Sequence, residues 1–114
     1  MNRCELTGRL TRDVEIRDVG ENKVARFTIA VDRRKKDESD FISCVAWNKT
    51  GEIIAKHFQK GAMIGVSGRI QTGSYTNREG NKVYTTDVVV DEFDFLEPKK
   101  KEAEEEFDYT NLPF

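Results

Sequence analysis

Three aromatic residues, Phe41, Trp47 and Tyr75, are of the type that can stack on flat ligands. Two of them lie in the run 41–47, where β-branched and aromatic residues between polar turn signals predict a strand. Because side chains alternate across a strand, Phe41 and Trp47 share one face, and the apolar set that starts at Ile42 faces the other way. Large aromatics are usually buried. The strand alone therefore leaves two possibilities, a face packed under another element and an open aromatic surface.

Cationic side chains accompany these rings. The charged connection 32–38 holds four consecutive cations, which form either a solvated loop or an arm that contacts phosphates. Rings stack on unpaired bases at ~1–3 kcal/mol each, while cations follow the phosphates without reading sequence. Carbohydrate also stacks on rings but gains little from so many cations. The candidate phosphate contacts are Arg3, Arg9, Arg26, Arg33, Arg34, Lys35, Lys36, Lys49, Arg69, Arg78 and Lys82.

No catalytic motif occurs in the sequence. It has no phosphate loop of glycines and lysine, no Cys/His nucleophile pair and no ligand spacing around its single histidine, His57, which we expect at the surface. One nuclease-like alternative remains, a metal held by Asp87, Asp91, Glu92 and Asp94, although acids at the end of a strand are usually a solvated edge. We therefore expect no enzymatic activity, no cofactor and no metal.

The elements that must position the rings are strands. We expect strands at 3–10, 24–31, 41–47, 63–71 and 83–95, and a short helix over 51–59 with Thr50 as its cap and Gly61 as its stop. The segment 14–17 either extends the first strand or forms its own. Five bent antiparallel strands with a helix between the third and fourth follow the plan of the OB fold, a small Greek-key barrel that commonly binds oligonucleotides or oligosaccharides. The predicted fold is thus an all-β, five-stranded OB barrel.

Composition divides the chain of 114 residues into a body, 1–97, and a tail, 98–114. Residues 1–96 carry 16 Lys and Arg against 15 Asp and Glu, whereas residues 97–114 carry 3 against 6. The net charge of −2 therefore does not exclude a polyanionic ligand, because the acidity lies in the tail. No apolar run approaches the ~18 residues of a membrane span, and there is no signal segment. We expect a cytoplasmic protein without membrane contact.

The tail is predicted to be disordered and acidic, since it has too few apolar residues to offset the entropy of ordering. Hydrophobic side chains near its end form either a docking peptide for a partner or an inert terminus. The two cysteines, Cys4 and Cys44, lack metal-ligand spacing, and both fall on strand positions that face the core. We expect free, buried thiols.

Seven runs of the chain match the pattern of one known family: residues 6–13 (LTGRLTRD), 27–31 (FTIAV), 40–47 (DFISCVAW), 60–61 (KG), 65–72 (GVSGRIQT), 84–90 (YTTDVVV) and 111–114 (NLPF). Taken together, these motifs resemble the bacterial-type single-stranded-DNA-binding protein family over nearly the whole chain.

That resemblance implies an OB-fold homotetramer of replication, recombination and repair, associated with the nucleoid, whose base-stacking aromatics fall on Phe41, Trp47 and Tyr75. A fourth family aromatic falls at or near Lys35, where this chain has no ring. The family's acidic tip, which recruits replication and repair enzymes, would here comprise Asp108, Leu112, Pro113 and Phe114.

Two departures separate this chain from the family pattern. The tip lacks the usual consecutive aspartates, which weakens the expectation that it docks the usual partners, and the linker is short. Such a compact member suits a phage or prophage as readily as a chromosome. The sequence thus predicts sequence-independent binding and protection of single-stranded DNA. The alternatives are an OB adaptor that buries Trp47 and Phe41 in a subunit interface, and an RNA-binding OB protein.

Overall fold

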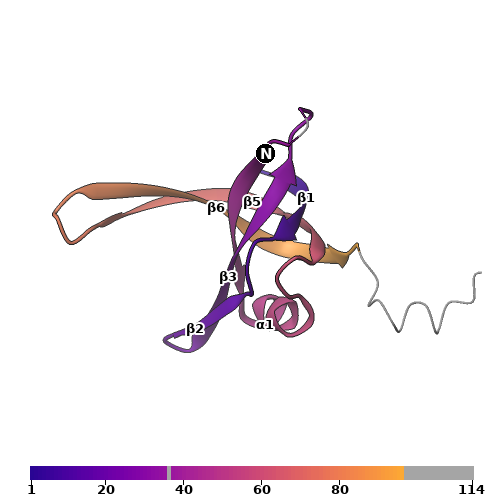
Figure 1. Ribbon diagram of the computed structural model, residues 1–114. Helices are drawn as coiled ribbons and strands as arrows, with labels where there is room; N and C mark the ends of the chain where they lie inside the picture. Colours follow the sequence, from indigo (N-terminus) through magenta and orange to yellow (C-terminus); the bar gives the residue numbers. More distant parts are fainter. Residues whose placement is uncertain (36, 97–114) are drawn as a thin grey trace, which may run out of the picture.

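The computed structural model describes residues 1–35 and 37–96. Its elements are β1 (Cys4–Leu10), β2 (Glu15–Val19), β3 (Asn22–Asp32), β4 (Ser39–Trp47), α1 (Asn48–His57), β5 (Met63–Thr76) and β6 (Lys82–Phe95), as Figure 1 shows. Lys36, the predicted disordered tail and the predicted tip residues Asp108, Leu112, Pro113 and Phe114 lie outside the described residues.

Five strands close into a ring in the order β1-β5-β6-β4-β3, and β3 returns to β1 through Arg9 and Leu10. The helix α1 lies between β4 and β5, the third and fourth strands of this ring in chain order. The predicted OB barrel is therefore confirmed. The expectation that all five strands are antiparallel is wrong at one place, since β4 and β6 pair in parallel. A closed ring with an odd number of strands cannot alternate direction throughout, so one parallel pair is unavoidable.

The segment that the sequence left open forms its own strand, β2. It pairs with β3 from Glu15 opposite Arg26 to Val19 opposite Asn22, outside the ring. Gly20 occupies the connecting turn with φ of +62°, a conformation that glycine adopts at no steric cost.

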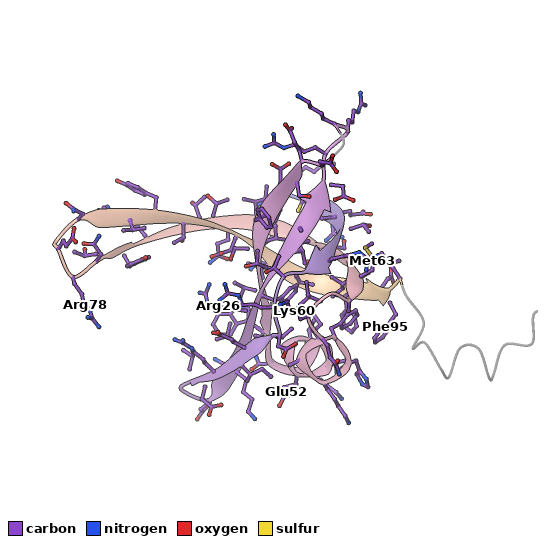
Figure 2. All side chains as sticks on the ribbon, viewed as in Figure 1. Arg26, Glu52, Lys60, Met63, Arg78 and Phe95 are labelled. Atoms are coloured by element: carbon purple, nitrogen blue, oxygen red, sulfur yellow. The ribbon has the colours of Figure 1, made fainter. Side chains whose placement is uncertain are left out.

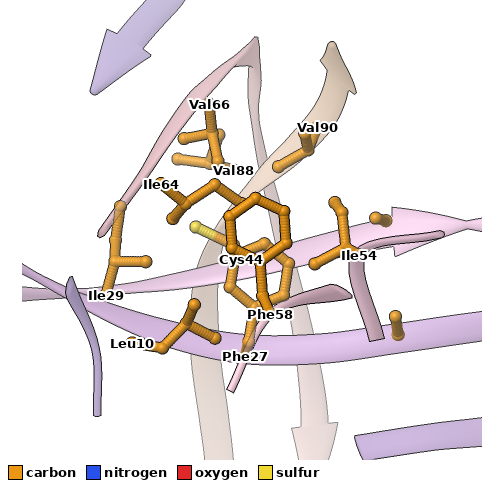
Figure 3. Packing of buried hydrophobic residues seen from close by; sticks show 12 residues of the cluster. Leu10, Phe27, Ile29, Cys44, Ile54, Phe58, Ile64, Val66, Val88 and Val90 are labelled. Atoms are coloured by element: carbon orange, nitrogen blue, oxygen red, sulfur yellow. The ribbon is translucent and has the colours of Figure 1, made fainter. Parts of the chain in front are cut away.

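The core lies inside the ring, where buried aliphatic and aromatic side chains from all five ring strands and α1 meet (Figure 3). Cys44 and Ala46 are fully buried and Ile42 packs against them, so the predicted inner face of β4 is confirmed. Both cysteines are free, with Cys44 buried and Cys4 half-buried. Burial raises the pKa of the Cys44 thiol to about 12.

The predicted Thr50 cap is wrong, because α1 begins at Asn48, directly after β4 and three residues before the predicted start at position 51. The residue at the N-cap position is Trp47, which makes no capping side-chain hydrogen bond. The Asn48 side chain instead accepts a hydrogen bond from the Lys23 backbone N–H at 3.0 Å and so ties the helix start to β3. The helix ends at His57, two residues before the predicted end, and His57 is exposed as expected.

Candidate nucleic-acid interface

A long arm, formed by the outer halves of β5 and β6, projects from the barrel (Figure 1). Its ladder runs from Arg69 opposite Val89 to Thr76 opposite Lys82. The Asn77 side chain closes the turn at its tip, accepting hydrogen bonds from the backbone N–H groups of Glu79 and Asn81 at 3.0 and 2.9 Å. The arm thus carries Tyr75 well outside the barrel wall.

A shift in register at the root of the arm, between Ser67 and Gly68, sets its direction. Only glycine fits there, because a Cβ on Gly68 would lie 1.9 Å from the Val89 carbonyl oxygen. The bulge lets β5 and β6 leave the barrel as a twisted ribbon instead of continuing its wall.

A groove of about 430 Å³ lies between β4 and the arm, whose residues 71–75 of β5 and Thr85, Asp87 and Val89 of β6 line it. Trp47 and Tyr75 line it, and Val45 and Val89 belong to its lining as well. These two valines are parallel-pair partners and are only 4% and 6% exposed, yet they lie outside the core cluster. They therefore form an apolar floor for the groove on the outer face of the sheet.

All three predicted stacking residues lie outward. Phe41, Trp47 and Tyr75 are 70%, 41% and 57% exposed, so within this chain the aromatic face of β4 is an open surface. Phe41 is not part of the groove: it lies six residues before Trp47 on the same strand face, roughly 20 Å away at the usual strand rise. The structure therefore places Trp47 and Tyr75 in one groove and Phe41 farther along the same face of β4. The surface that carries these three rings is called the track below.

A second, smaller hollow of about 200 Å³ continues this track along β3 and β4. Thr28 and Ser43 line it as a cross-strand pair, together with Arg12 from the β1–β2 connection. Arg26 lines both hollows and so links them. Sequence reasoning missed Arg12, because strand alternation says nothing about a residue in a loop.

Two cations of the connection before β4, Arg33 and Lys35, pair with nearby acids. Arg33 donates to Asp40 Oδ1 at 2.9 and 2.6 Å and lies 3.6 Å from Glu38. The hydrogen bonds between Arg33 and Asp40 raise the pKa of the guanidinium and lower that of the carboxyl. Lys35 lies 3.9 Å from Glu38. Two of its cations therefore pair with neighbouring carboxylates, which favours the solvated loop over the phosphate-contacting arm for these two side chains.

The other candidate cations are spread over several faces. Arg3 and Arg69 both approach Asp91, at 3.4 and 3.8 Å, and Arg9 donates to the Gly61 carbonyl at 2.9 Å. Among the cations proposed from the sequence and described by the structure, only Arg26 lines the groove. Figure 2 shows Arg26 close to the barrel and Arg78 at the far end of the arm. Within residues 1–35 and 37–96, four candidates have no ion pair: Arg34, Lys49, Arg78 and Lys82, and the Lys82 ammonium lies over the Tyr84 ring.

Two further residues of the arm were missed. Tyr84 is 75% exposed, with the Lys82 ammonium 5.5 Å from its ring centre, on the arm face opposite Tyr75. Asp87 lines the groove from β6, directly opposite Gln71 of β5. Strand alternation predicts which face of the arm each of these side chains occupies, but in the sequence Asp87 was interpreted only as a possible metal ligand.

The carboxylates that a nuclease would need for its metal form ion pairs with different arginines. Asp87 lies 3.9 Å from Arg26, whereas Asp91 faces Arg3 and Arg69. Over the part of the chain that the structure describes, no three His, Cys, Asp or Glu side chains form a group that could hold a metal ion. That part also has no helix that is both long and apolar enough to cross a membrane.

A closed five-strand OB barrel with exposed rings along one outer track defines the class of small barrels that bind single strands. Residues 1–96 match the model of the Single-strand binding protein family, and the chain belongs to this family.

Relatives in several bacteria carry the same description. The chain is 55% identical over 100 residues to the single-stranded DNA-binding protein of Clostridium perfringens, a match that covers 85% of this chain and 67% of that protein. It is 46% identical over 111 residues to single-stranded DNA-binding protein 1 of Lactococcus lactis, covering 92% and 74%. A third relative, from Halalkalibacterium halodurans, is 44% identical over 110 residues, covering 91% and 66%.

Proposed function

We propose that this chain binds and protects single-stranded DNA without enzymatic activity, by stacking unpaired bases along the track of Tyr75, Trp47 and Phe41. The observation that carries the proposal is the groove in which two exposed rings flank a floor of buried valines. A flat base can lie against such rings while its phosphates stay in water. Each stacked base contributes about 1–3 kcal/mol and requires no particular base identity.

The cations are assigned to the phosphates. Arg26 and Arg12 border the track, and Arg34, Lys49 and Arg78 are exposed cations without an ion pair in the described chain. Arg33 and Lys35 are poorer candidates, because a phosphate would have to compete with Asp40 and Glu38. Phosphate contacts of this kind make the affinity fall as salt rises.

The chain is further assigned to a homotetramer, as the family resemblance implies. One structural feature supports self-association: residues Cys4–Gly8 of β1 pair only with β5, so that one edge of β1 is open within the described chain. A strand that passes over several subunits gains avidity beyond a single barrel. Residues 1–97 would form the binding domain, and residues 98–114 would recruit replication and repair proteins in the cytoplasm, near the nucleoid.

The adaptor alternative requires Trp47 and Phe41 to be covered by another subunit. A fluorescence titration separates it from the proposed function, because Trp47 is the only tryptophan of the chain. We expect poly(dT) to quench Trp47 fluorescence saturably, at low and at moderate salt, while duplex DNA does not. A folded protein whose fluorescence is insensitive to poly(dT) would overturn the proposal in favour of the adaptor. Poly(U) tests the RNA alternative in the same assay.

A further inference from the structure

Asn2, two residues before β1, is tied to the root of the arm by its side-chain amide. Its Nδ2 donates to the Ile70 carbonyl oxygen, and its Oδ1 accepts a hydrogen bond from the Ile70 backbone N–H, both at 2.9 Å. One planar amide thus pairs with both backbone groups of a single β5 residue, as an opposite strand residue does in an antiparallel ladder. The side chain thereby continues the pairing of β1 with β5 beyond its last backbone pair, Cys4 opposite Gly68.

Ile70 belongs to the row of residues from which the arm leaves the barrel. In the ladder it lies opposite Val88 of β6, and Val88 pairs in turn with Cys44 of β4. Asn2 therefore holds one edge of the hairpin at the same level at which β4 holds the other edge. Farther out, residues 71–76 of β5 and 82–87 of β6 pair only with each other within the described chain. Strand pairing to the rest of the barrel thus ends at this row.

The groove begins directly beyond the Asn2 contact. Residues 71–75 of β5 line it, with Tyr75 at the outer end, while Trp47 lines it from β4. Because the two rings belong to different elements, their separation depends on the direction in which the two-stranded ribbon leaves the barrel. The bulge at the root bends this ribbon. Asn2 holds the β5 edge just after the bend, so it fixes the direction that the bulge permits.

We propose that Asn2 is a positioning residue for DNA binding, which clamps the root of the arm and so sets the spacing of Tyr75 and Trp47 around a base. The inference rests on the proposed function, because Asn2 does not line the groove and acts through Ile70. Without the clamp, the last point at which the outer edge of β5 is held moves back from position 70 to Gly68. Binding must then order the ribbon as well as the DNA strand, which lowers the affinity.

Asn2→Leu tests the clamp, because leucine is close to asparagine in size and has no polar side-chain atom. Hydrogen exchange of the Ile70 amide reports on the contact directly, since the Asn2 side chain accepts its hydrogen bond. We expect this amide to be protected in the unaltered protein and to exchange roughly ten-fold faster in Asn2→Leu. An Ile70 amide that exchanges equally fast in both proteins would overturn the inference, because the clamp would then be absent in solution.

Affinity for a labelled oligo(dT) separates positioning from a general structural role. We expect Asn2→Leu to weaken binding roughly five-fold. In a Tyr75→Ala background the same change should weaken binding less than about two-fold, because the ring that Asn2 positions is gone. In a Phe41→Ala background the five-fold loss should remain, since Phe41 lies outside the groove. Equal losses in the two backgrounds, or an unchanged affinity of Asn2→Leu itself, would overturn the inference.

Gln59→Ala is the matched control. It removes an exposed side-chain amide that makes no hydrogen bond within residues 1–35 and 37–96, just after the end of α1. We expect both the exchange of the Ile70 amide and the affinity for oligo(dT) to stay as in the unaltered protein. Failure of the unaltered protein to bind oligo(dT) would overturn the proposed function, whereas each outcome that overturns the role of Asn2 leaves that function intact. Circular dichroism confirms that each variant is folded.

Discussion

At the scale of the residue, Trp47 is the side chain for which we most strongly expect a role in DNA binding. Its ring is 41% exposed and lines the groove above the valine floor, so its removal takes away a stacking surface but little of the core. We expect Trp47→Ala to weaken binding to single-stranded DNA by about 1–3 kcal/mol per site, measured by anisotropy of a labelled oligonucleotide. Thermal unfolding should remain cooperative.

The matched control is Tyr84→Ala, which removes a more exposed ring from the other face of the arm. We expect its affinity to stay close to that of the unaltered protein. A Trp47→Ala protein that does not fold would mean that Trp47 is a packing residue. Equal losses of DNA affinity in both variants would mean that any exposed ring contributes to binding, whichever face of the arm or barrel it occupies.

Alternation along the strand was enough to predict the orientation of Phe41 and Trp47, because it needs only the backbone period of two. It was not enough for Val45, which shares their face but is buried at 4% exposure. Its burial depends on the pairing with Val89, which is 44 positions away in the chain. The pairing of Arg33 with Asp40 likewise depends on how the β3–β4 hairpin closes, which charge counting cannot show.

At the scale of the element, the arm depends on the bulge at its root. We expect Gly68→Ala to destabilise the protein by about 1–3 kcal/mol or more, because the added Cβ would lie 1.9 Å from the Val89 carbonyl oxygen and must displace β6. The displacement should also lower DNA affinity, since Val89 belongs to the groove. Thermal unfolding and DNA titration measure the two effects.

Gly73→Ala provides the comparison on the same strand. The added Cβ would meet only the Thr85 hydroxyl, at 3.2 Å, and that side chain can rotate. We therefore expect the Gly73→Ala protein to unfold at nearly the same temperature as the unaltered protein. Unchanged stability in Gly68→Ala would show that the strands separate there without cost and that the bulge does not fix the arm.

The order of strands and the hairpin were predictable from turn residues and alternation, but the pairing of β4 with β6 was not. Local patterns carry no information about which distant strand closes a ring. The helix start was misplaced for a related reason: Asn48 uses its side chain on the backbone of Lys23, a contact from another element, so the usual capping pattern is absent.

At the scale of the whole molecule, the binding surface and the predicted tip occupy separate parts of the chain. We expect deletion of residues 112–114 to leave DNA affinity nearly intact, because every residue of the groove lies at or before position 89. Capture of replication and repair proteins on immobilised protein should fall. Undiminished capture by the shortened chain would contradict the docking role, and a large loss of DNA affinity would mean that the tip belongs to the binding surface.

The closure of the ring also bears on how the chain folds as it is made. β6 is the last strand of the described chain, and it pairs with both β5 and β4. When only the residues before 82 have left the ribosome, the nascent chain therefore has two open sheet edges, on β4 and β5. Its groove also lacks Val89, one of the two valines of the floor. Such unpaired edges are prone to association with other chains. The nascent protein is thus most vulnerable to aggregation just before β6 emerges, and DNA has no complete groove to bind until then.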